Sequence, residues 1–146
     1  MKNKNIENAK SAENTKSTKE NEMISLIPKM NNYREILEYA KKNYSNNIAY
    51  KYKKNPEEKP AKYVEKTYNE TIKDVKALAT ALLKRGLANK RVALIGENRY
   101  EWCVSYLAVT CGGMIIAPLD KTLPDKEITE LIKRSEVDAV IFEKKH

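Results

Sequence analysis

The strongest constraint on the fold is a short apolar run, residues 91–95 (RVALI), which follows Lys90 and precedes Gly96. Val and Ile favour strands. A continuous apolar run, rather than an alternating one, predicts a strand that is buried on both faces. Strands of this kind are typical of parallel sheets that helices cover on both sides. The run therefore predicts an α/β fold.

The residues after this strand predict a buried helix. Asn98 precedes Glu101 by three positions, which is the spacing of a capping box with Asn in the usual Ser/Thr place. Residues 102–109 are almost wholly apolar, and Gly112-Gly113 follows them. We therefore expect a helix that begins near Asn98 and ends at the glycine pair.

The same alternation continues along the chain. Residues 114–117 form a second apolar run, Thr122 and Pro124 supply a helix start, and residues 137–142 predict a third strand. The second helix has an apolar stripe, made of Ile128, Leu131 and Ile132. With right-handed crossovers, a β-α-β-α-β order gives part of a doubly wound, mostly parallel sheet.

Three further elements are predicted ahead of the sheet. A helix from Asn32 carries an apolar stripe of Tyr33, Ile36, Leu37, Ala40 and Tyr44. Ile48, Tyr50 and Tyr52 alternate with other residues, and a turn-rich segment separates them from residues 63–67, so this region predicts a β-hairpin. Thr67 and Glu70 form a capping box before a long helix that Gly86 ends.

The first 22 residues hold mainly Lys, Asn, Glu and Ser. Such a segment buries too little apolar surface to offset its ordering entropy, so residues 1–30 are predicted to be a disordered tail and linker, and residues 31–146 one domain. The tail lacks the apolar centre of a signal peptide, and its Glu residues argue against a transit peptide. A cytoplasmic location is expected, because no run is long enough to span a bilayer.

Several ordered motifs now carry a resemblance to a known family. They are Thr67–Glu70, Arg91–Leu94, Glu97–Trp102, Gly112-Gly113, Pro118–Asp120, Leu123-Pro124 and Glu127-Ile128. Together they resemble the N-terminal segment of the AMP-forming acyl-CoA synthetases, within the adenylate-forming superfamily. The Glu-Asn-Arg-Tyr-Glu-Trp run at residues 97–102 is most similar to long-chain fatty-acid CoA ligases.

The resemblance implies a function for the longer enzyme. Such ligases convert a fatty acid, ATP and CoA into acyl-CoA, AMP and pyrophosphate through an acyl-adenylate, with magnesium. The phosphate-binding loop and the catalytic Lys lie further along than residue 146, so the chain resembles an incomplete, truncated N-terminal domain. No catalytic, cofactor-binding or metal residue is assigned here, and the chain alone is expected to bind no cofactor and to be inactive.

Two residues are candidates for one wall of a substrate pocket, Asn98 and Trp102. Both have a structural alternative. Gly96-Glu97-Asn98 lies where a strand meets a helix N-terminus, which is a natural anion site, but a single Gly without a phosphate-loop pattern favours simple capping. Trp102 lies in an apolar helix, where an aromatic residue is more often a core anchor than a substrate platform.

The formal charge of +8 raises the question of a nucleic acid or an anionic membrane as partner. Six lysines between residues 51 and 66 lie among Tyr50, Tyr52 and Tyr63, a combination that can stack on single strands. Lys far outnumbers Arg and the charge is spread along the chain, so we expect no nucleic acid. Peripheral membrane contact and self-association through exposed sheet surface remain open.

The remaining reactive residues predict little chemistry. Cys103 and Cys111 are eight apart on one predicted helix, about 12 Å by helical rise, which is too far for a disulfide. His146 is the single histidine, so no zinc set is predicted. Two functions therefore stay open: the N-terminal portion of an acid:CoA ligase, or a standalone basic binding module or degenerate relic.

Overall fold

The computed structural model describes residues 28–55 and 57–144. Contacts divide the chain into two units, residues 1–31 and residues 32–146, and the helices and strands of the described residues lie in the second unit. Residues 1–27 of the predicted tail lie outside the described residues. The division of the chain into a tail and one truncated domain stays a prediction.

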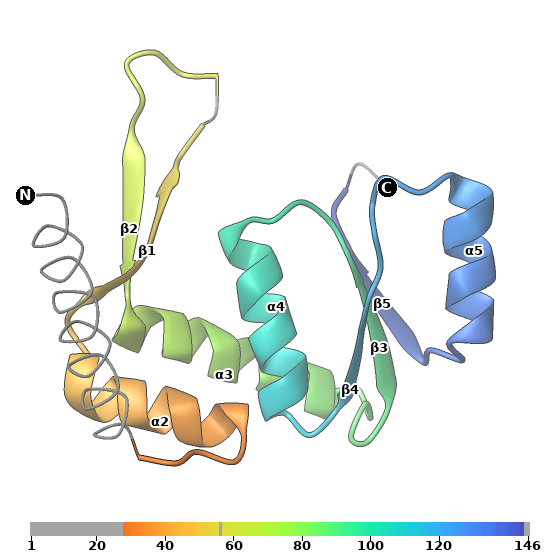
Figure 1. The fold of residues 1–146 in the computed structure, drawn as a ribbon, viewed down its shortest axis with the longest axis horizontal. Helices are drawn as coiled ribbons and strands as arrows, with labels where there is room; N and C mark the ends of the chain where they lie inside the picture. Colours follow the sequence, from red (N-terminus) through yellow and green to blue (C-terminus); the bar gives the residue numbers. More distant parts are fainter. Residues whose placement is uncertain (1–27, 56, 145–146) are drawn as a thin grey trace, which may run out of the picture. The chain divides into compact units, whose positions relative to one another are not determined.

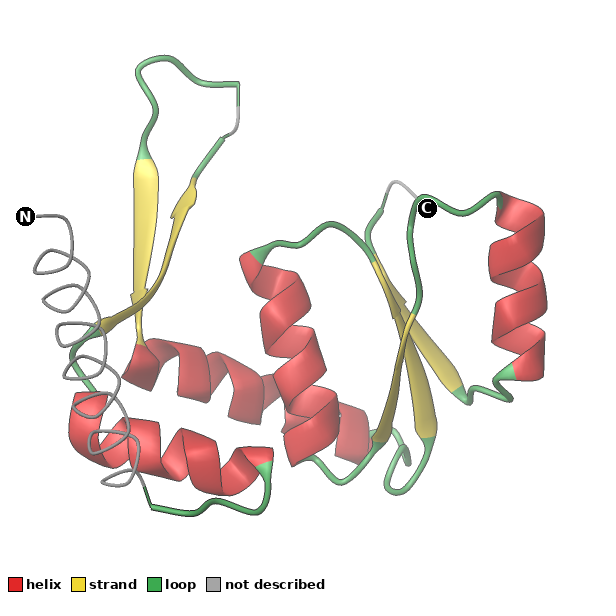
Figure 2. Cartoon of the chain, in the orientation of Figure 1, coloured by secondary structure: helices red, strands yellow, loops and turns green. Residues whose placement is uncertain are grey.

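The unit begins with a helix, a hairpin and a second helix (Figures 1 and 2). Helix α2, Tyr33–Tyr44, starts at Asn32, whose side chain accepts a hydrogen bond from the Glu35 amide at 3.0 Å. Strands β1, Ile48–Lys53, and β2, Tyr63–Thr67, pair antiparallel. The predicted helix and hairpin are both present.

Helix α3, Tyr68–Lys84, has the predicted capping box. The Thr67 hydroxyl oxygen accepts from the Glu70 amide at 3.2 Å, and the Glu70 carboxylate accepts from the Thr67 amide at 2.8 Å. Gly86 follows the helix with a φ of 80°, the left-handed conformation that glycine adopts at low cost. Both ends of α3 therefore lie where the sequence predicts them.

The sheet contains three parallel strands in the order β4-β3-β5, which confirms the predicted α/β fold. The strands are β3, Arg91–Ile95, β4, Ile115–Pro118, and β5, Ala139–Phe142. Helix α4, Tyr100–Cys111, connects β3 to β4, and helix α5, Asp125–Arg134, connects β4 to β5. The middle strand β3 is buried from Val92 to Ile95.

The two faces of this sheet differ in packing. On one face Val92 packs with Leu82 of α3, Val109 of α4 and Met114 in a buried cluster. On the other face α5 contributes only half-buried residues, Ile128, Leu131 and Ile132, and no residue of this fully described helix is buried. Phe142 is 59% exposed, and a gap of about 450 Å³ lies between α5 and the sheet. The predicted stripe of α5 therefore covers its face only in part.

The stripe of α2 is also only partly buried. Ala40 is buried and Leu37 is half-buried, whereas Tyr33, Ile36 and Tyr44 are each more than 40% exposed. Helical spacing predicts which side of α2 is apolar, and the contacts of α2 with α3 and α4 determine how much of that side is covered.

The predicted cap at Asn98 is wrong. Helix α4 starts at Tyr100 with Arg99 at the capping position, and none of the described side chains caps it. The Arg99 amide donates to the Glu97 carbonyl at 2.7 Å, which makes a tight turn and moves the first helical bond to the Cys103 amide and the Arg99 carbonyl. Asn98 lies in this turn and is exposed. The spacing of Asn98 and Glu101 is that of a capping box, but it is shifted by one residue from the helix start.

Two further features concern the rest of the unit. Asp120 stabilises a turn, because its carboxylate accepts from the Thr122 amide at 2.8 Å and from the Thr122 hydroxyl at 2.7 Å. Within residues 28–55 and 57–144, no helix is both long and apolar enough to cross a membrane. The cytoplasmic location stays a prediction.

The capping box of α3 gives a direct test of this fold. We expect Thr67→Ala to lower the free energy of unfolding by about 1 kcal/mol, because the Glu70 amide at the helix start loses the hydroxyl oxygen that accepts its hydrogen bond. The matched control is Thr80→Ala, the same change at an exposed site inside α3, where we expect less than about 0.5 kcal/mol. Urea unfolding monitored by circular dichroism measures both, and equal losses would contradict the role of the cap.

Candidate functional site

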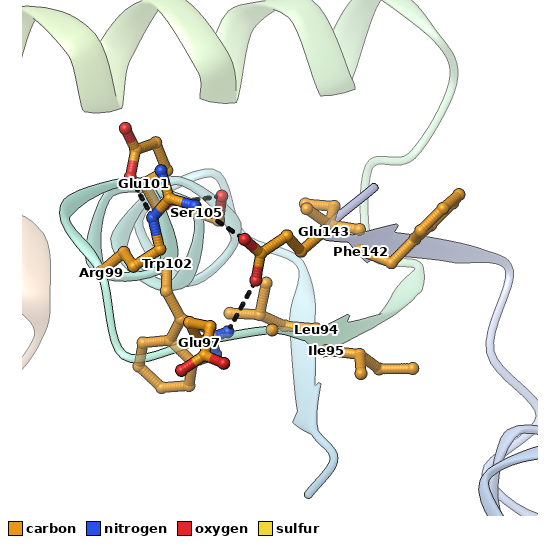
Figure 3. Close-up of a pocket in the computed structure, with 11 residues that line it drawn as sticks. Leu94, Ile95, Glu97, Arg99, Glu101, Trp102, Ser105, Phe142 and Glu143 are labelled. Carbon is orange, nitrogen blue, oxygen red and sulfur yellow. Dashed lines mark hydrogen bonds and ion pairs between the residues drawn. The ribbon is translucent and has the colours of Figure 1, made fainter. Parts of the chain in front are cut away.

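A pocket of about 220 Å³ lies where the carboxyl ends of β3 and β5 meet the start of α4 (Figure 3). The carboxyl ends of parallel strands are the usual ligand side of an open α/β sheet. The lining residues are Leu94, Ile95, Gly96, Glu97, Arg99, Glu101, Trp102, Ser105, Ile141, Phe142 and Glu143. Its wall is thus apolar on the strand side and charged at the rim.

Glu143 organises the polar part of this pocket. Its side chain is 19% exposed and accepts hydrogen bonds from the Arg99 guanidinium at 2.7 Å and from the Glu97 backbone amide at 3.3 Å. The Glu97 amide, directly after Gly96, is therefore already hydrogen-bonded to a carboxylate of the chain itself. This arrangement favours a structural role for the Gly96 turn over a phosphate site.

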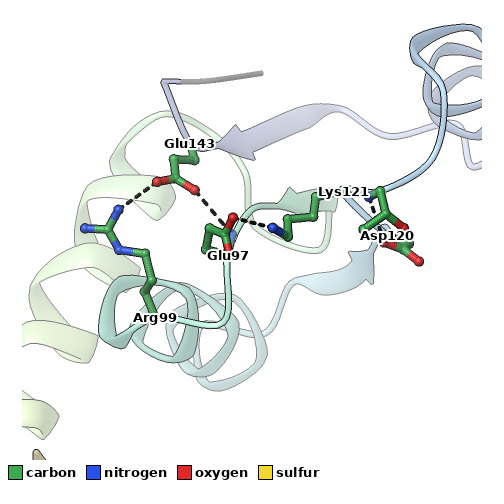
Figure 4. A network of polar contacts seen from close by, with 6 residues as sticks. Glu97, Arg99, Asp120, Lys121 and Glu143 are labelled. Carbon is green, nitrogen blue, oxygen red and sulfur yellow. Dashed lines mark hydrogen bonds and ion pairs between the residues drawn. The ribbon is translucent and has the colours of Figure 1, made fainter. Parts of the chain in front are cut away.

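A second ion pair extends the network to the loop that follows β4 (Figure 4). Lys121, which follows β4, pairs with the carboxylate of Glu97, which follows β3. The ends of β3, β4 and β5 are thus joined by Glu97, Lys121 and Glu143. These polar contacts hold together the loops that border the pocket.

The charge of the lining limits what the pocket can bind. Three carboxylates, those of Glu97, Glu101 and Glu143, face one guanidinium, that of Arg99. Lys121 also pairs with Glu97, and the side chains of Glu97 and Glu101 are 47% and 65% exposed, but the carboxylates still outnumber the cations, so this lining disfavours a phosphate or a free carboxylate. An uncharged part of a ligand fits the apolar wall better.

The two predicted wall residues have different positions. Trp102 lines the pocket, is half-buried and stacks on Tyr106 with ring centroids 5.5 Å apart. It belongs to neither buried cluster, so the interpretation of Trp102 as a core anchor is wrong. Asn98 is exposed and is not among the lining residues. The assignment of either residue to a substrate wall stays a prediction.

Sequence reasoning missed Arg99, Ser105, Phe142 and Glu143 as pocket residues. Glu143 is 46 positions from the amide it binds, so no local pattern connects them. The usable signal was its place directly after the third predicted strand, because the carboxyl ends of neighbouring parallel strands meet. That rule alone brings Glu143 close to Glu97.

Behind the pocket, the first residue of α4 is held by an aromatic cluster. Tyr100 is buried, stacks on Tyr52 at 5.4 Å and meets the edge of Tyr50 at 5.3 Å. Its hydroxyl donates to the Asp74 carboxylate at 2.7 Å, and the Lys66 ammonium donates to the same oxygen at 3.2 Å. The hairpin, α3 and the start of α4 are therefore joined directly beside Arg99.

These contacts shift the acidity of the groups that make them. The hydrogen bond from Tyr100, followed by Lys66, lowers the pKa of Asp74, although burial acts in the opposite direction. Burial, followed by the bond to Asp74, raises the pKa of Tyr100. Burial and the neighbouring Cys103 thiol raise the pKa of Tyr50 to about 12. Both tyrosines are therefore neutral at physiological pH.

The described residues offer no metal centre. Within them, no group of three or more His, Cys, Asp or Glu side chains could hold a metal ion. Cys103 and Cys111 are free and half-buried, and burial raises the pKa of the Cys111 thiol, which disfavours the reactive thiolate.

Comparison with known proteins identifies the family. The sequence profile of the family described as AMP-binding enzyme matches residues 37–146, most of the chain. The chain belongs to the AMP-binding enzyme family. This membership confirms the resemblance that the sequence motifs indicate, and full enzymes of the family use ATP.

Individual relatives of the AMP-binding chain agree. It is 34% identical over 88 residues to long chain acyl-CoA synthetase 4 of Arabidopsis thaliana, which covers 60% of this chain and 13% of that protein. The chain thus spans about an eighth of the length of this curated relative.

Solved structures share the fold of this AMP-binding chain. The inhibitor-bound N-terminal domain of FACL13 from Mycobacterium tuberculosis matches with a TM-score of 0.66 and 24% identity, over 77% of this chain and 27% of that one. Apo MatB from Rhodopseudomonas palustris matches with a TM-score of 0.53 and 28% identity, over 56% and 17%. The α/β architecture described above is therefore that of the N-terminal part of adenylate-forming domains.

The Asp74 contacts of this AMP-binding unit make a testable electrostatic prediction. Because the pKa of Asp74 is lowered, its contribution to stability is present above the usual Asp pKa and is lost as the pH falls through the lowered value. We expect Tyr100→Phe to raise the pKa of Asp74 more than Lys66→Gln does, since the Tyr100 hydrogen bond is the larger cause. NMR titration of the Asp74 carboxyl measures both shifts. A larger effect of Lys66→Gln would show that the ion pair dominates.

Proposed function

We propose that this chain is the N-terminal portion of an AMP-forming acid:CoA ligase that acts on fatty acids. The observation that carries the proposal is the family match over residues 37–146, together with 34% identity over 88 residues to a long chain acyl-CoA synthetase. The Glu97–Trp102 run lies at the pocket rim rather than in a remote element, which supports a role of this motif in shaping a ligand site.

The reaction we propose for the longer enzyme has two steps. A carboxylate oxygen of the acid attacks the α-phosphorus of ATP, giving an acyl-adenylate and pyrophosphate. The CoA thiol then attacks the acyl carbon and AMP leaves. When bound to the longer enzyme, magnesium would supply charge that offsets the phosphates. Within the described residues, no group of three or more His, Cys, Asp or Glu side chains could hold that metal, so none of them is assigned to it.

The contribution of this chain to that reaction follows from its pocket. Trp102, Phe142 and Leu94 present apolar surface, whereas the rim carries more carboxylate than cationic charge. This distribution suits the uncharged tail of an acid and disfavours its carboxylate and the triphosphate. We therefore propose that the pocket is one wall of the acid site and that the reacting groups lie beyond it.

The first test uses the chain as it is. We expect the purified 146-residue chain to show no exchange of pyrophosphate into ATP with any acid from short to long, because its sequence holds neither the phosphate-binding loop nor the catalytic Lys that the resemblance to acyl-CoA synthetases implies. Exchange above a no-protein blank, in a preparation free of host ligase, would place the chemistry within this chain and overturn the assignment.

The second test asks whether the pocket contacts the acid. Residues 37–146 replace the matching segment of an active long-chain acyl-CoA synthetase, and acid-dependent AMP formation is measured. In this chimera we expect Trp102→Ala to raise the KM for a long-chain acid about tenfold, with a smaller effect on kcat, because it removes apolar contact with the tail.

The matched control in the same chimera is Tyr44→Ala, which changes an exposed aromatic residue that contacts Tyr39 but does not line the pocket. It should leave the KM unchanged. A chimera that unfolds cooperatively yet forms no AMP would contradict the ligase proposal. Equal KM values for the two variants would contradict the wall assignment alone.

A further inference from the structure

The hairpin of β1 and β2 has two chemically different faces. Tyr50 and Tyr52 point to α4, where they pack on Tyr100, and their cross-strand partners Lys66 and Val64 share that side. The alternation of a strand places the residues between them on the opposite face. That outer face and the connecting loop carry Lys51, Lys53, Lys54, Lys59, Lys62 and Tyr63, which we call the hairpin patch.

We propose that the hairpin patch is a docking surface for anionic phospholipid membranes. The lysines of the patch are all exposed, and the strands extend away from α3 toward the loop (Figure 1). In the contacts of the described elements, the hairpin packs on α3 at its base and on Tyr100 of α4 through Tyr50 and Tyr52. Among the described residues, most of the lysines lie toward the loop end, beyond these contacts, where they are exposed.

The ion pairs of the hairpin leave an excess of positive charge. Lys51 pairs with Glu65 at 2.6 Å, and Lys62 pairs with Glu58 at 2.6 Å. Lys53, Lys54 and Lys59 have no acidic partner within the described residues, and Glu57 is the one remaining acid between positions 51 and 65. This local excess complements the negative potential of a membrane that contains anionic lipids.

Tyr63 adds a second kind of contact. It is 54% exposed, lies directly opposite Lys53 in the register, and has the Lys51 ammonium 5.6 Å from its ring centroid. Tyrosine has an apolar ring and a polar tip, which favours the boundary between lipid headgroups and acyl chains. An exposed tyrosine surrounded by lysines can therefore enter the headgroup layer while the ammonium groups contact phosphates.

The same residues fit a nucleic acid less well. Binding of single strands depends on several aromatic rings that stack on successive bases. Of the three tyrosines that lie among these lysines, Tyr50 and Tyr52 are turned inward and packed on Tyr100, and only Tyr63 stays exposed. The patch also holds no Arg, the residue suited to bidentate contacts with bases. The patch can therefore attract a nucleic acid by its charge, but it offers a single exposed ring rather than a series of rings for stacking on successive bases.

The test is co-sedimentation of the full chain with phosphatidylcholine vesicles that contain or lack phosphatidylglycerol. We expect binding to the anionic vesicles alone, with a decrease as the salt concentration rises. The triple variant Lys53→Gln/Lys54→Gln/Lys59→Gln should weaken this binding by at least about tenfold, and Tyr63→Ala should weaken it further.

The matched control is the triple variant Lys73→Gln/Lys84→Gln/Lys126→Gln, which removes the same charge from exposed lysines of α3 and α5. Both triple variants lower the formal charge from +8 to +5, so they differ only in the position of the lost charge. The control should retain most of the binding. Equal losses in the two variants, or no binding of the unmodified chain at low salt, would overturn the proposal.

A parallel titration with oligonucleotides distinguishes an anionic membrane from a nucleic acid as the partner of the patch. A labelled single strand and a duplex are titrated with the same variants at the same salt concentration. Weak binding that both triple variants lower equally agrees with the proposal. Tight binding that depends on Lys53, Lys54 and Lys59, without vesicle binding, would assign the patch to nucleic acid instead. These readouts do not depend on ligase activity, so their failure is distinguishable from failure of the proposed function.

Discussion

The burial of β3 is the constraint on which the rest of the unit depends. Val92 and Ala93 are completely buried, and Leu94 and Ile95 are nearly so, because β3 pairs with a parallel strand on each side and needs cover on both faces. Helices α3 and α4 cover one face with a dense cluster. Helix α5 covers the other less completely, and Phe142 at the end of β5 remains exposed. In this AMP-binding unit, one face of the sheet is therefore covered by packed helices, whereas the other face keeps exposed apolar surface.

The parallel arrangement also explains where the pocket forms. The ends of three parallel strands meet at one edge, so Glu97, Lys121 and Glu143 come together although they are far apart in the chain. Their mutual contacts join the loops that border the pocket, and the apolar side chains of Trp102, Leu94 and Phe142 line it. The polar network thus gives shape to the pocket, while an apolar ligand tail would contact residues that take no part in it.

Tyr100 connects this pocket with the hairpin. Its ring packs on Tyr50 and Tyr52, its hydroxyl binds Asp74 of α3, and its backbone begins α4 beside Arg99. By drawing two hairpin tyrosines inward, the same contact leaves the lysines on the outer face. The proposed acid wall and the proposed membrane surface are therefore structurally joined through one buried aromatic residue, although each is tested separately.

The sequence by itself determined the elements whose signals are local. The apolar run 91–95, the capping box of Thr67 and Glu70, and Gly86 predict strand β3 and helix α3 correctly, because each depends on neighbours within a few positions. Tertiary structure decided the rest. Asn98 does not cap α4, since a backbone bond from Arg99 to Glu97 sets the helix start. Trp102 borders a pocket rather than the core, and Glu143 reaches the Glu97 amide, because strands distant in sequence end side by side. Periodicity predicts which apolar residues share one side of a helix or strand, but only the packing of distant segments determines which of them are covered.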